Sequence, residues 1–274
     1  MHLHSRLSDG LNSPRTVLKF AAKRGYGVAI TDHNAAAGSV EAVRLAKHYG
    51  VLCIPGIELN SYDGPHLLAY FYTIDELKEF WTRHIARARL KNPCGRLRLP
   101  ALKLLELSED YNALVSLAHP FGMWWVNVGR CVHNDRSKLE LLKRVDAIEI
   151  LAGSLLRKMN LASLRLHKLM VKHRREGFTT AITAGSDGHT VIAHGSCVTC
   201  TKAEHAVDSD SFLKAVTKSR VFALGKEPFT ELLLENAVML RRHLRYAPNW
   251  LRESYRRLYP HGLGLRQRVR ARML

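Results

Sequence analysis

The fold and the candidate site both follow from one stretch, His2-Leu3-His4-Ser5-Arg6-Leu7-Ser8-Asp9-Gly10, which places two histidines and a carboxylate within the first nine positions. Side chains on a strand alternate with period two, so an H-x-H pair puts both imidazoles on one face. Two ring nitrogens on one face, with a carboxylate nearby, make the first half of a transition-metal site. The rest of the chain is therefore expected to supply the other half.

The chain has 274 residues and a formal net charge of +18, half of which lies at one end. Ten arginines stand between residues 241 and 272, against the single acid Glu253. A strongly basic tail suits nucleic acid or an anionic membrane surface, so peripheral membrane contact through the tail is one expectation. A solvated, partly disordered tail explains the charge equally well.

No run of about 18 apolar residues is present, which excludes a spanning helix, and no signal-peptide pattern precedes the opening motif. The number of cysteines is odd and their spacing is irregular, so we expect reduced thiols and a cytoplasmic setting. Cys197-Val198-Thr199-Cys200 is a lone C-x-x-C, which is poor evidence for structural zinc. The five cysteines are Cys53, Cys94, Cys131, Cys197 and Cys200.

Apolar, β-branched runs alternate with helical patterns, which favours parallel strands with helices outside. About seven such units could close into a barrel. The stretch 92–100 has two prolines and a glycine and is expected to form a loop. The expected strands are Val28–Thr31, Val51–Leu59, Leu67–Phe71, Leu114–Ala118, Ala147–Leu151, Thr179–Ala184 and Arg220–Leu224.

Helix boundaries are also readable. Ser13 followed by Pro14 predicts a helix start, and Gly25 predicts its stop. The stretch 39–49 repeats the pattern, with Gly50 as its stop. Longer helical stretches cover 75–91 and 154–176, and past about Pro228 basic helical sequence replaces the strand pattern.

Candidate ligands recur at the ends of these strands. A lone histidine is more often a surface or core residue than a ligand, and His48, His84, His133, His167, His173, His194, His205, His243 and His261 mostly belong to that class. Ionisable groups at the ends of several apolar strands are different, because their desolvation is costly unless they are paired or bound to metal. In a parallel barrel this rim is where active sites form. The groups concerned are Asp32-His33, Glu58, His66, His119 and Asp187 with His189.

The ordered set H-x-H…S-D-G, T-D-H, G-x-E, His before L-x-x-Y, A-H-P and G-S-D-x-H resembles the PHP (polymerase and histidinol phosphatase) family over about residues 1–225. The resemblance implies an α/β fold, a distorted (β/α)7 barrel, with two or three divalent metal ions. It implies a first metal held by His2, His4, Glu58 and Asp187, a second held by Glu58, His66 and His119, and a third held by Asp9, His33 and His189. The family usually has an aspartate before H-x-H, where this chain has Met1. Either the first strand is short, or the true start of the protein lies upstream.

The ligand chemistry agrees with this resemblance, because mixed imidazole and carboxylate ligands suit zinc, manganese or iron. A metal-bound water deprotonates near neutrality, so a hydroxide could attack phosphorus without a serine or cysteine nucleophile. Asp32 is expected either to orient a ligating imidazole by accepting a hydrogen bond from its other ring N–H or to have a purely structural role. Arg130 and Arg157 follow strands and are candidates for binding phosphate.

The leading expectation is a metallophosphoesterase domain over residues 1–227, followed by a basic helical extension over 228–274. Its substrate would be a small phosphate monoester, a nucleotide or an oligonucleotide end. The alternative is a protein that binds nucleic acid or an anionic membrane surface, with a mainly structural metal site. The sequence leaves the oligomeric state open.

Overall fold

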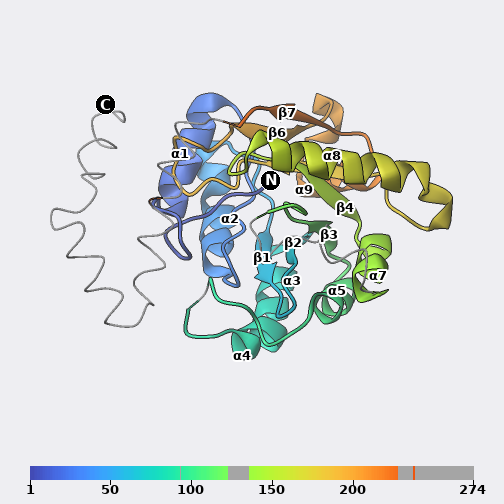
Figure 1. Ribbon diagram of the computed structural model, residues 1–274. Coiled ribbons are helices and arrows are strands. Elements are labelled where there is room, and N and C mark those ends of the chain that lie inside the picture. Colours follow the sequence, from blue (N-terminus) through green and yellow to red (C-terminus); the bar gives the residue numbers. More distant parts are fainter. Residues whose placement is uncertain (93, 123–135, 228–236, 238–274) are drawn as a thin grey trace.

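The computed structural model describes residues 1–92, 94–122, 136–227 and 237, and shows a mixed α/β fold (Figure 1). The strands are β1 Gly56–Asn60, β2 His66–Tyr70, β3 Leu114–Leu117, β4 Ala147–Ala152, β5 Ile182–Gly185, β6 Cys197–Cys200 and β7 Phe222–Gly225. The helices are α1 Pro14–Arg24, α2 Ala37–Tyr49, α3 Ile74–Phe80, α4 Ala86–Ala88, α5 Ala101–Glu109, α7 Arg136–Arg144, α8 Arg157–Lys172 and α9 Ser209–Thr217. A π-helical turn, Trp81–Ile85, joins α3 to α4, and short 3-10 turns cover Arg174–Glu176 and Ala203–His205.

Five strands form one sheet in the order β1-β2-β3-β4-β5. The expectation of parallel strands throughout is wrong, because β2 runs antiparallel to both β1 and β3. Only five residues, 61–65, connect β1 to β2, which is too short for the crossover that a parallel pair needs. The pairs β3–β4 and β4–β5 are parallel, as expected.

Two extended segments link the outer strands of this sheet. Leu3 forms a parallel bridge with Gly188 just beyond β5, and the Thr31 N–H donates to the Leu3 carbonyl at 2.8 Å. The segment around His33 in turn bridges Glu58 in β1. These isolated bridges replace the regular strands expected at 28–31 and at the amino terminus, so a regular seven-stranded barrel is not established.

The close passage of the amino terminus over β5 depends on Gly185. A Cβ atom at Gly185 would lie 2.3 Å from the Cβ of His2, which is too close for any side chain. Two backbone hydrogen bonds, from the Asp187 N–H to the His2 carbonyl and from the His4 N–H to the Gly188 carbonyl, then hold this segment against residues 187–188. The first strand is short, as expected, but its backbone is held on both sides.

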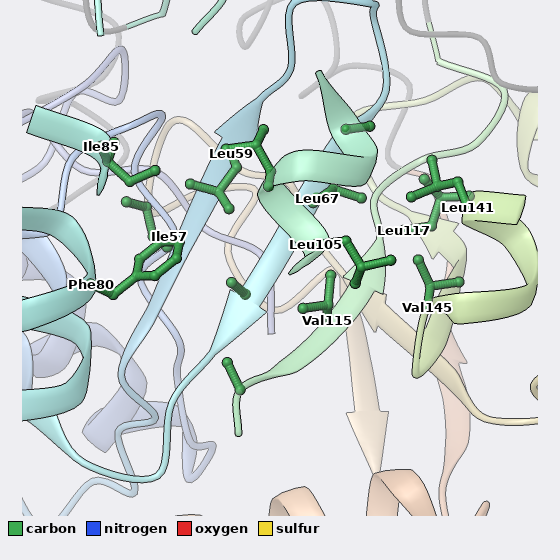
Figure 2. Close-up of a cluster of buried hydrophobic side chains, with 14 of the residues drawn as sticks. Ile57, Leu59, Leu67, Phe80, Ile85, Leu105, Val115, Leu117, Leu141 and Val145 are labelled. Carbon is green, nitrogen blue, oxygen red and sulfur yellow. The ribbon is translucent and has the colours of Figure 1, made fainter. Parts of the chain in front are cut away.

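Strand alternation separates a hydrophobic core from a polar interior. Ile57 and Leu59 of β1 point into the core under α3 and α5, and Phe80 packs beside them (Figure 2). Glu58 lies between the two on the strand, so its side chain leaves on the opposite face. One strand therefore supplies both core residues and a buried carboxylate, which is 0% exposed.

The helix predictions hold for both ends of α1 and for the end of α2, but α2 begins at Ala37 rather than at residue 39 and has no side-chain cap. Ser13 caps α1, with its Oγ accepting from the Thr16 N–H at 3.2 Å, and Gly25 closes α1 in the left-handed region at φ 68°. Gly50 closes α2 in the same way at φ 62°. The helix expected at 75–91 is shorter and contains the π-helical turn at 81–85.

The C-x-x-C motif lies in β6, which pairs with β7 in a separate two-stranded sheet. Residues three apart on a strand face opposite sides, so Cys197 and Cys200 do not converge on a metal ion. Both are free thiols, as are Cys53 and Cys94, whereas Cys131 lies outside the described residues.

Among the described residues, no helix has the length and apolar composition needed to cross a membrane. The basic tail and the expected boundary at 227/228 fall where only residue 237 is described. The membrane and nucleic-acid roles of that tail, and the division into two domains, therefore stay predictions.

Candidate metal centre

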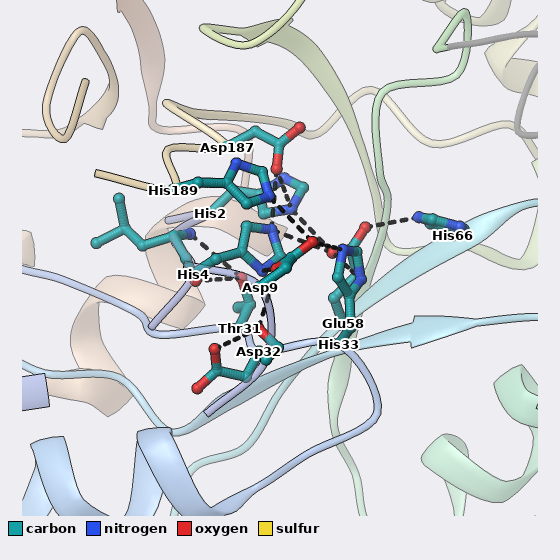
Figure 3. A network of polar contacts seen from close by, with 12 residues as sticks. His2, His4, Asp9, Thr31, Asp32, His33, Glu58, His66, Asp187 and His189 are labelled. Carbon is teal, nitrogen blue, oxygen red and sulfur yellow. Dashed lines mark hydrogen bonds and ion pairs between the residues drawn. The ribbon is translucent and has the colours of Figure 1, made fainter. Parts of the chain in front are cut away.

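The nine side chains singled out in the sequence meet in one cluster, buried except for the half-buried His66. Figure 3 shows this cluster from close by, with His119 not labelled. They come from the amino-terminal segment, the extended segment at 33, β1, the start of β2, the end of β3 and the loop after β5. Within the cluster lie three groups whose ligand atoms are all within 4.8 Å of one another. The groups are His2, His4, Glu58 and Asp187; His4, Asp9, His33 and His189; and His33, Glu58 and His66.

The first group surrounds the carboxylates of Glu58 and Asp187. His2 Nε2 lies 3.3 Å from Glu58 Oε2 and 3.2 Å from Asp187 Oδ1, and His4 Nε2 lies 3.3 and 2.9 Å from the same two atoms. His2 Nε2 and Glu58 Oε2 are buried, and none of their close contacts in the described structure has hydrogen-bond geometry. Buried polar atoms without partners are costly, and a shared cation between them would remove that cost.

Glu58 also reaches a second set of imidazoles through its other oxygen. Oε1 lies 2.8 Å from His66 Nδ1 and 3.3 Å from His119 Nε2, while Oε2 lies 2.8 Å from His33 Nδ1. The expected second set of Glu58, His66 and His119 is therefore brought together. Glu58 therefore faces different imidazoles with its two oxygens.

The third group is centred on Asp9. Its Oδ2 lies 3.3 Å from the Nε2 atoms of both His33 and His189, and its Oδ1 lies 3.6 Å from His4 Nδ1. The His4 ring stacks between the rings of His33 and His189, with both centroid distances 4.5 Å. His4 therefore faces two groups at once, which the sequence did not predict.

Electrostatics within the cluster favours charged carboxylates. Although burial opposes ionisation, the surrounding imidazoles hold the pKa of Glu58, Asp9 and Asp187 well below the usual range. Burial opposes protonation of His2 and His33 too, yet nearby carboxylates raise the pKa of both well above its ordinary value. Burial instead lowers the pKa of His4, and that of His66 to about 4. The cluster thus combines charged carboxylates with neutral and proton-bearing imidazoles, and divalent cations could take the place of the protons.

Two of the cluster residues have strained backbones. His119 has φ 23° and Asp187 has φ 46°, in a region that non-glycine residues rarely adopt. The His119 N–H donates to Glu149 Oε2 at 2.8 Å, and the Asp187 N–H donates to the His2 carbonyl at 2.8 Å. Strain that is held by specific hydrogen bonds is typical of functional sites.

Glu149 connects the cluster to the sheet. Its carboxylate accepts from His2 Nδ1 at 3.0 Å and from the His119 backbone at 2.8 Å, and it is 1% exposed. These contacts turn His2 Nε2 toward Glu58 and Asp187. The sequence signal was present, because Glu149 is the one carboxylate in the otherwise apolar strand β4.

We expect Glu149→Gln to lower metal affinity about 10- to 100-fold, the usual effect of losing a carboxylate behind a ligating histidine. Metal titration of the purified variant, followed by competition with a chromogenic chelator, measures this. Glu106→Gln, at an exposed helix position, is the matched control. Equal affinities in both variants would rule out a positioning role for Glu149.

Asp32 supports the loop that carries Asp9 and accepts no hydrogen bond from the described imidazoles. It accepts from the Ser5 N–H at 2.7 Å and from the hydroxyls of Ser5 and Ser8, both at 2.6 Å. Ser8 also donates to Asp9 at 3.2 Å. Gly38 leaves room for this carboxylate, since a Cβ there would lie 1.9 Å from Asp32 Oδ2. Asp32 thus acts on Asp9 through Ser8.

Other contacts of the cluster escaped sequence reasoning. Asn60 Oδ1 lies 2.9 Å from His33 Nδ1, and the Ser154 hydroxyl hydrogen-bonds to Asp187 Oδ2. Neither residue stands in a motif that would have marked it. Of the two candidate phosphate-binding arginines, Arg130 lies outside the described residues, and Arg157 is exposed at the start of α8.

The fold and the buried cluster together define a mixed α/β protein with a candidate multi-metal centre. The PHP domain family model matches residues 1–190, more than half of the chain, and the chain therefore belongs to the PHP domain family.

Relatives of known activity match one part of the chain each. Over 64 residues it is 41% identical to phosphoribosyl 1,2-cyclic phosphate 1,2-diphosphodiesterase of Eggerthella lenta, covering 23% of this chain and 24% of that protein. Over 67 residues it is 37% identical to 3',5'-nucleoside bisphosphate phosphatase of Chromobacterium violaceum, covering 24% of each. The chain thus spans about a quarter of the length of each of these two relatives.

Solved structures show the same fold. The lesion-specific endonuclease Q of Pyrococcus furiosus superimposes with a TM-score of 0.58 at 17% identity. The match covers 83% of this chain and 58% of that one. At this identity the likeness concerns the fold alone.

Proposed function

We propose that this protein is a metal-dependent phosphoesterase whose ions are held by the nine-residue cluster. The observation that carries the proposal is the pair His2 Nε2 and Glu58 Oε2, which are buried 3.3 Å apart and make no contact with hydrogen-bond geometry in the described structure. The first ion would be held by His2, His4, Glu58 and Asp187, the second by Glu58, His66 and His119, and the third by Asp9, His33 and His189. The donor set of imidazoles and carboxylates suits zinc, manganese or iron.

When bound, adjacent divalent ions supply a nucleophile at neutral pH and stabilise the charge that develops during in-line displacement at phosphorus. The protein's own part is positioning. Glu149 turns His2, Ser154 fixes Asp187, and Asp32 holds the loop of Asp9. Burial of these groups strengthens each electrostatic contact, since the local dielectric constant is low.

The names of the relatives support a phosphoester substrate. By these names, the two curated relatives act on a cyclic phosphodiester and on a nucleoside bisphosphate, and endonuclease Q acts on DNA. A phosphoester is the bond common to all three. We therefore propose phosphoester hydrolysis on a small monoester, a nucleotide or an oligonucleotide, with the five-stranded sheet and its two bridging segments enclosing the cluster as a distorted barrel.

A substrate panel tests this proposal. The full chain, loaded with Mn²⁺ or Zn²⁺, is assayed for phosphate release from mononucleotides, nucleoside bisphosphates, sugar phosphates and short oligonucleotides. We expect turnover of at least one class that disappears on chelation and returns with metal. If no phosphoester is cleaved with any of the metals, the proposal is wrong.

The pKa shifts predict that metal affinity rises with pH. His2 and His33, raised above 6.5, carry protons that a metal must displace, so affinity falls as the pH drops below their folded pKa. Their stabilising effect on the metal-free fold is complete below pH 6.5 and is lost as the pH rises through the folded pKa. Glu58 and Asp9, whose pKa values are lowered, also stabilise the metal-free fold. Their effect is complete above their unfolded pKa and is lost as the pH falls through the folded pKa.

We expect the Mn²⁺ dissociation constant to decrease at least about tenfold per pH unit between pH 6 and 8, which corresponds to one displaced proton. Isothermal titration at several pH values, in two buffers of different ionisation enthalpy, measures both the affinity and the released protons. A dissociation constant that is flat with pH would contradict imidazole ligation.

A further inference from the structure

The exposed face of α8 carries several positive charges and no negative charge. Between Ser154 and Arg175 the sequence has seven arginines and lysines and no aspartate or glutamate. Five of these basic residues lie within α8 and are exposed: Arg157, Lys158, Arg165, Lys168 and Lys172. We call these five residues the α8 stripe.

The stripe is one face of the helix. At 100° per residue its five positions fall within an arc of about 100°. The buried residues of α8, Asn160, Ser163 and Met170, lie on the opposite side. The helix thus packs with one side and presents the charged side to solvent along about 22 Å.

Acidic side chains do not neutralise the stripe within the described part of the chain. Elsewhere some basic residues do have acidic partners: the exposed Lys103 lies 3.1 Å from Glu106, and the half-buried Arg144 lies 2.8 Å from Glu109. Glu176, which follows the stripe, instead accepts from His173 at 2.7 Å. An unpaired row of cations is an electrostatic footprint for a polyanion.

The stripe begins beside the metal centre. Ser154, three residues before Arg157, hydrogen-bonds to Asp187 of the cluster. Asn160 anchors the first turn of α8 to Ala152 at the end of β4 through two hydrogen bonds of 3.0 and 2.9 Å. Figure 1 shows α8 starting close to the amino terminus, where His2 and His4 lie, and running outward across the molecule.

We infer that the α8 stripe binds the phosphate backbone of a nucleic-acid strand and guides the strand into the metal centre. The substrate class is then an oligonucleotide, an inference that rests on the proposed function. At about 3.4 Å per nucleotide along a strand, 22 Å corresponds to about six nucleotides. Phosphate contacts of this kind give affinity without sequence preference.

The arrangement fits a nucleic acid better than a membrane surface. A helix that lies in a membrane interface separates an apolar face from a charged one. In α8 the exposed Leu161 falls inside the charged arc and Leu169 at its border, while the remaining apolar side packs on the protein. A membrane role would also leave unexplained why the stripe starts at a phosphoesterase centre.

The test measures binding of a single-stranded phosphorothioate DNA of about ten nucleotides to the full metal-loaded chain at several salt concentrations. The stripe variant is Arg165→Gln, Lys168→Gln and Lys172→Gln together. The matched control is Lys19→Gln, Lys23→Gln and Lys47→Gln, which removes the same charge from the exposed surfaces of α1 and α2. Both variants keep the basic tail, so a difference between them reports on α8.

We expect the stripe variant to bind at least about tenfold more weakly at low salt, with the slope of log affinity against log salt reduced by about 2, which is three single-strand phosphate contacts. The control should bind like the unmodified chain. Equal weakening in both variants, or none in the stripe variant, would overturn the inference. Binding of the same variants to phosphatidylcholine vesicles that contain phosphatidylserine is measured in parallel. If the stripe variant binds these vesicles more weakly but binds DNA normally, the inference is overturned as well.

Hydrolysis of p-nitrophenyl phosphate by the unmodified chain separates this inference from the proposed function. If the small ester is cleaved and the stripe variant still binds DNA normally, the inference alone fails. If DNA binding depends on the stripe but no phosphoester is cleaved, the proposed function fails while the surface stands as a nucleic-acid site.

Discussion

Replacing Glu58 by glutamine is expected to lower phosphoester hydrolysis at least about 10³-fold, the equivalent of about 4 kcal/mol of transition-state stabilisation. Glu58 belongs to two of the three ligand groups, and its oxygens lie 2.8 Å from ring nitrogens of His33 and His66. Glutamine has nearly the same shape but carries no charge and offers a single acceptor oxygen. It cannot bridge two cations.

The loss should follow metal content rather than folding. In the Glu58→Gln variant we expect only the group of His4, Asp9, His33 and His189 to keep its ion. Metal analysis, circular dichroism and turnover are measured on the same samples. Glu106→Gln, exposed on α5, is the matched control and should keep full metal content and activity. Full activity in the Glu58 variant would exclude this carboxylate from the metal centre.

Removing the metal ions is expected to lower the melting temperature by about 8–16 °C. An ion whose dissociation constant is about a thousandfold lower than its free concentration adds about 4 kcal/mol to the free energy of unfolding. In a domain of this size each kcal/mol corresponds to about 2–4 °C. The effect has a structural reason, because the cluster joins the amino terminus, β1 and the loop after β5.

Differential scanning fluorimetry with and without chelator measures this shift, and re-addition of Mn²⁺ or Zn²⁺ should restore it. Glu58→Gln should show a smaller shift, since fewer ions remain to be removed. An identical melting temperature in all conditions would mean that the cluster binds no ion in solution.

The ligand positions could be read from the sequence because each lies at the end of an apolar strand or in a short fixed motif. His2 and His4 share a face through their spacing, and Glu58 opposes the core residues Ile57 and Leu59 through strand alternation. These are local properties. The start of α1 and the ends of α1 and α2 are local as well, since the Ser13 side chain caps its own helix and Gly25 and Gly50 adopt the left-handed conformation.

Strand direction and long-range partners could not be read in the same way. The antiparallel placement of β2 follows from the five-residue connection at 61–65, a cue that the alternating strand and helix pattern concealed. Glu149 reaches His2 across 147 residues, and Ser154 reaches Asp187 across 33. Such contacts depend on packing in three dimensions, and no residue spacing encodes them.

The central claim is that the nine-residue cluster holds catalytic metal ions, and metal analysis of the purified full chain tests it most directly. Inductively coupled plasma mass spectrometry, after incubation with Mn²⁺ or Zn²⁺ and extensive dialysis, should find two or three ions per chain, up to one for each ligand group. The same preparation of the Glu58→Gln variant should hold fewer. Less than one ion per chain, in a folded protein that still cleaves phosphoesters, would contradict the claim.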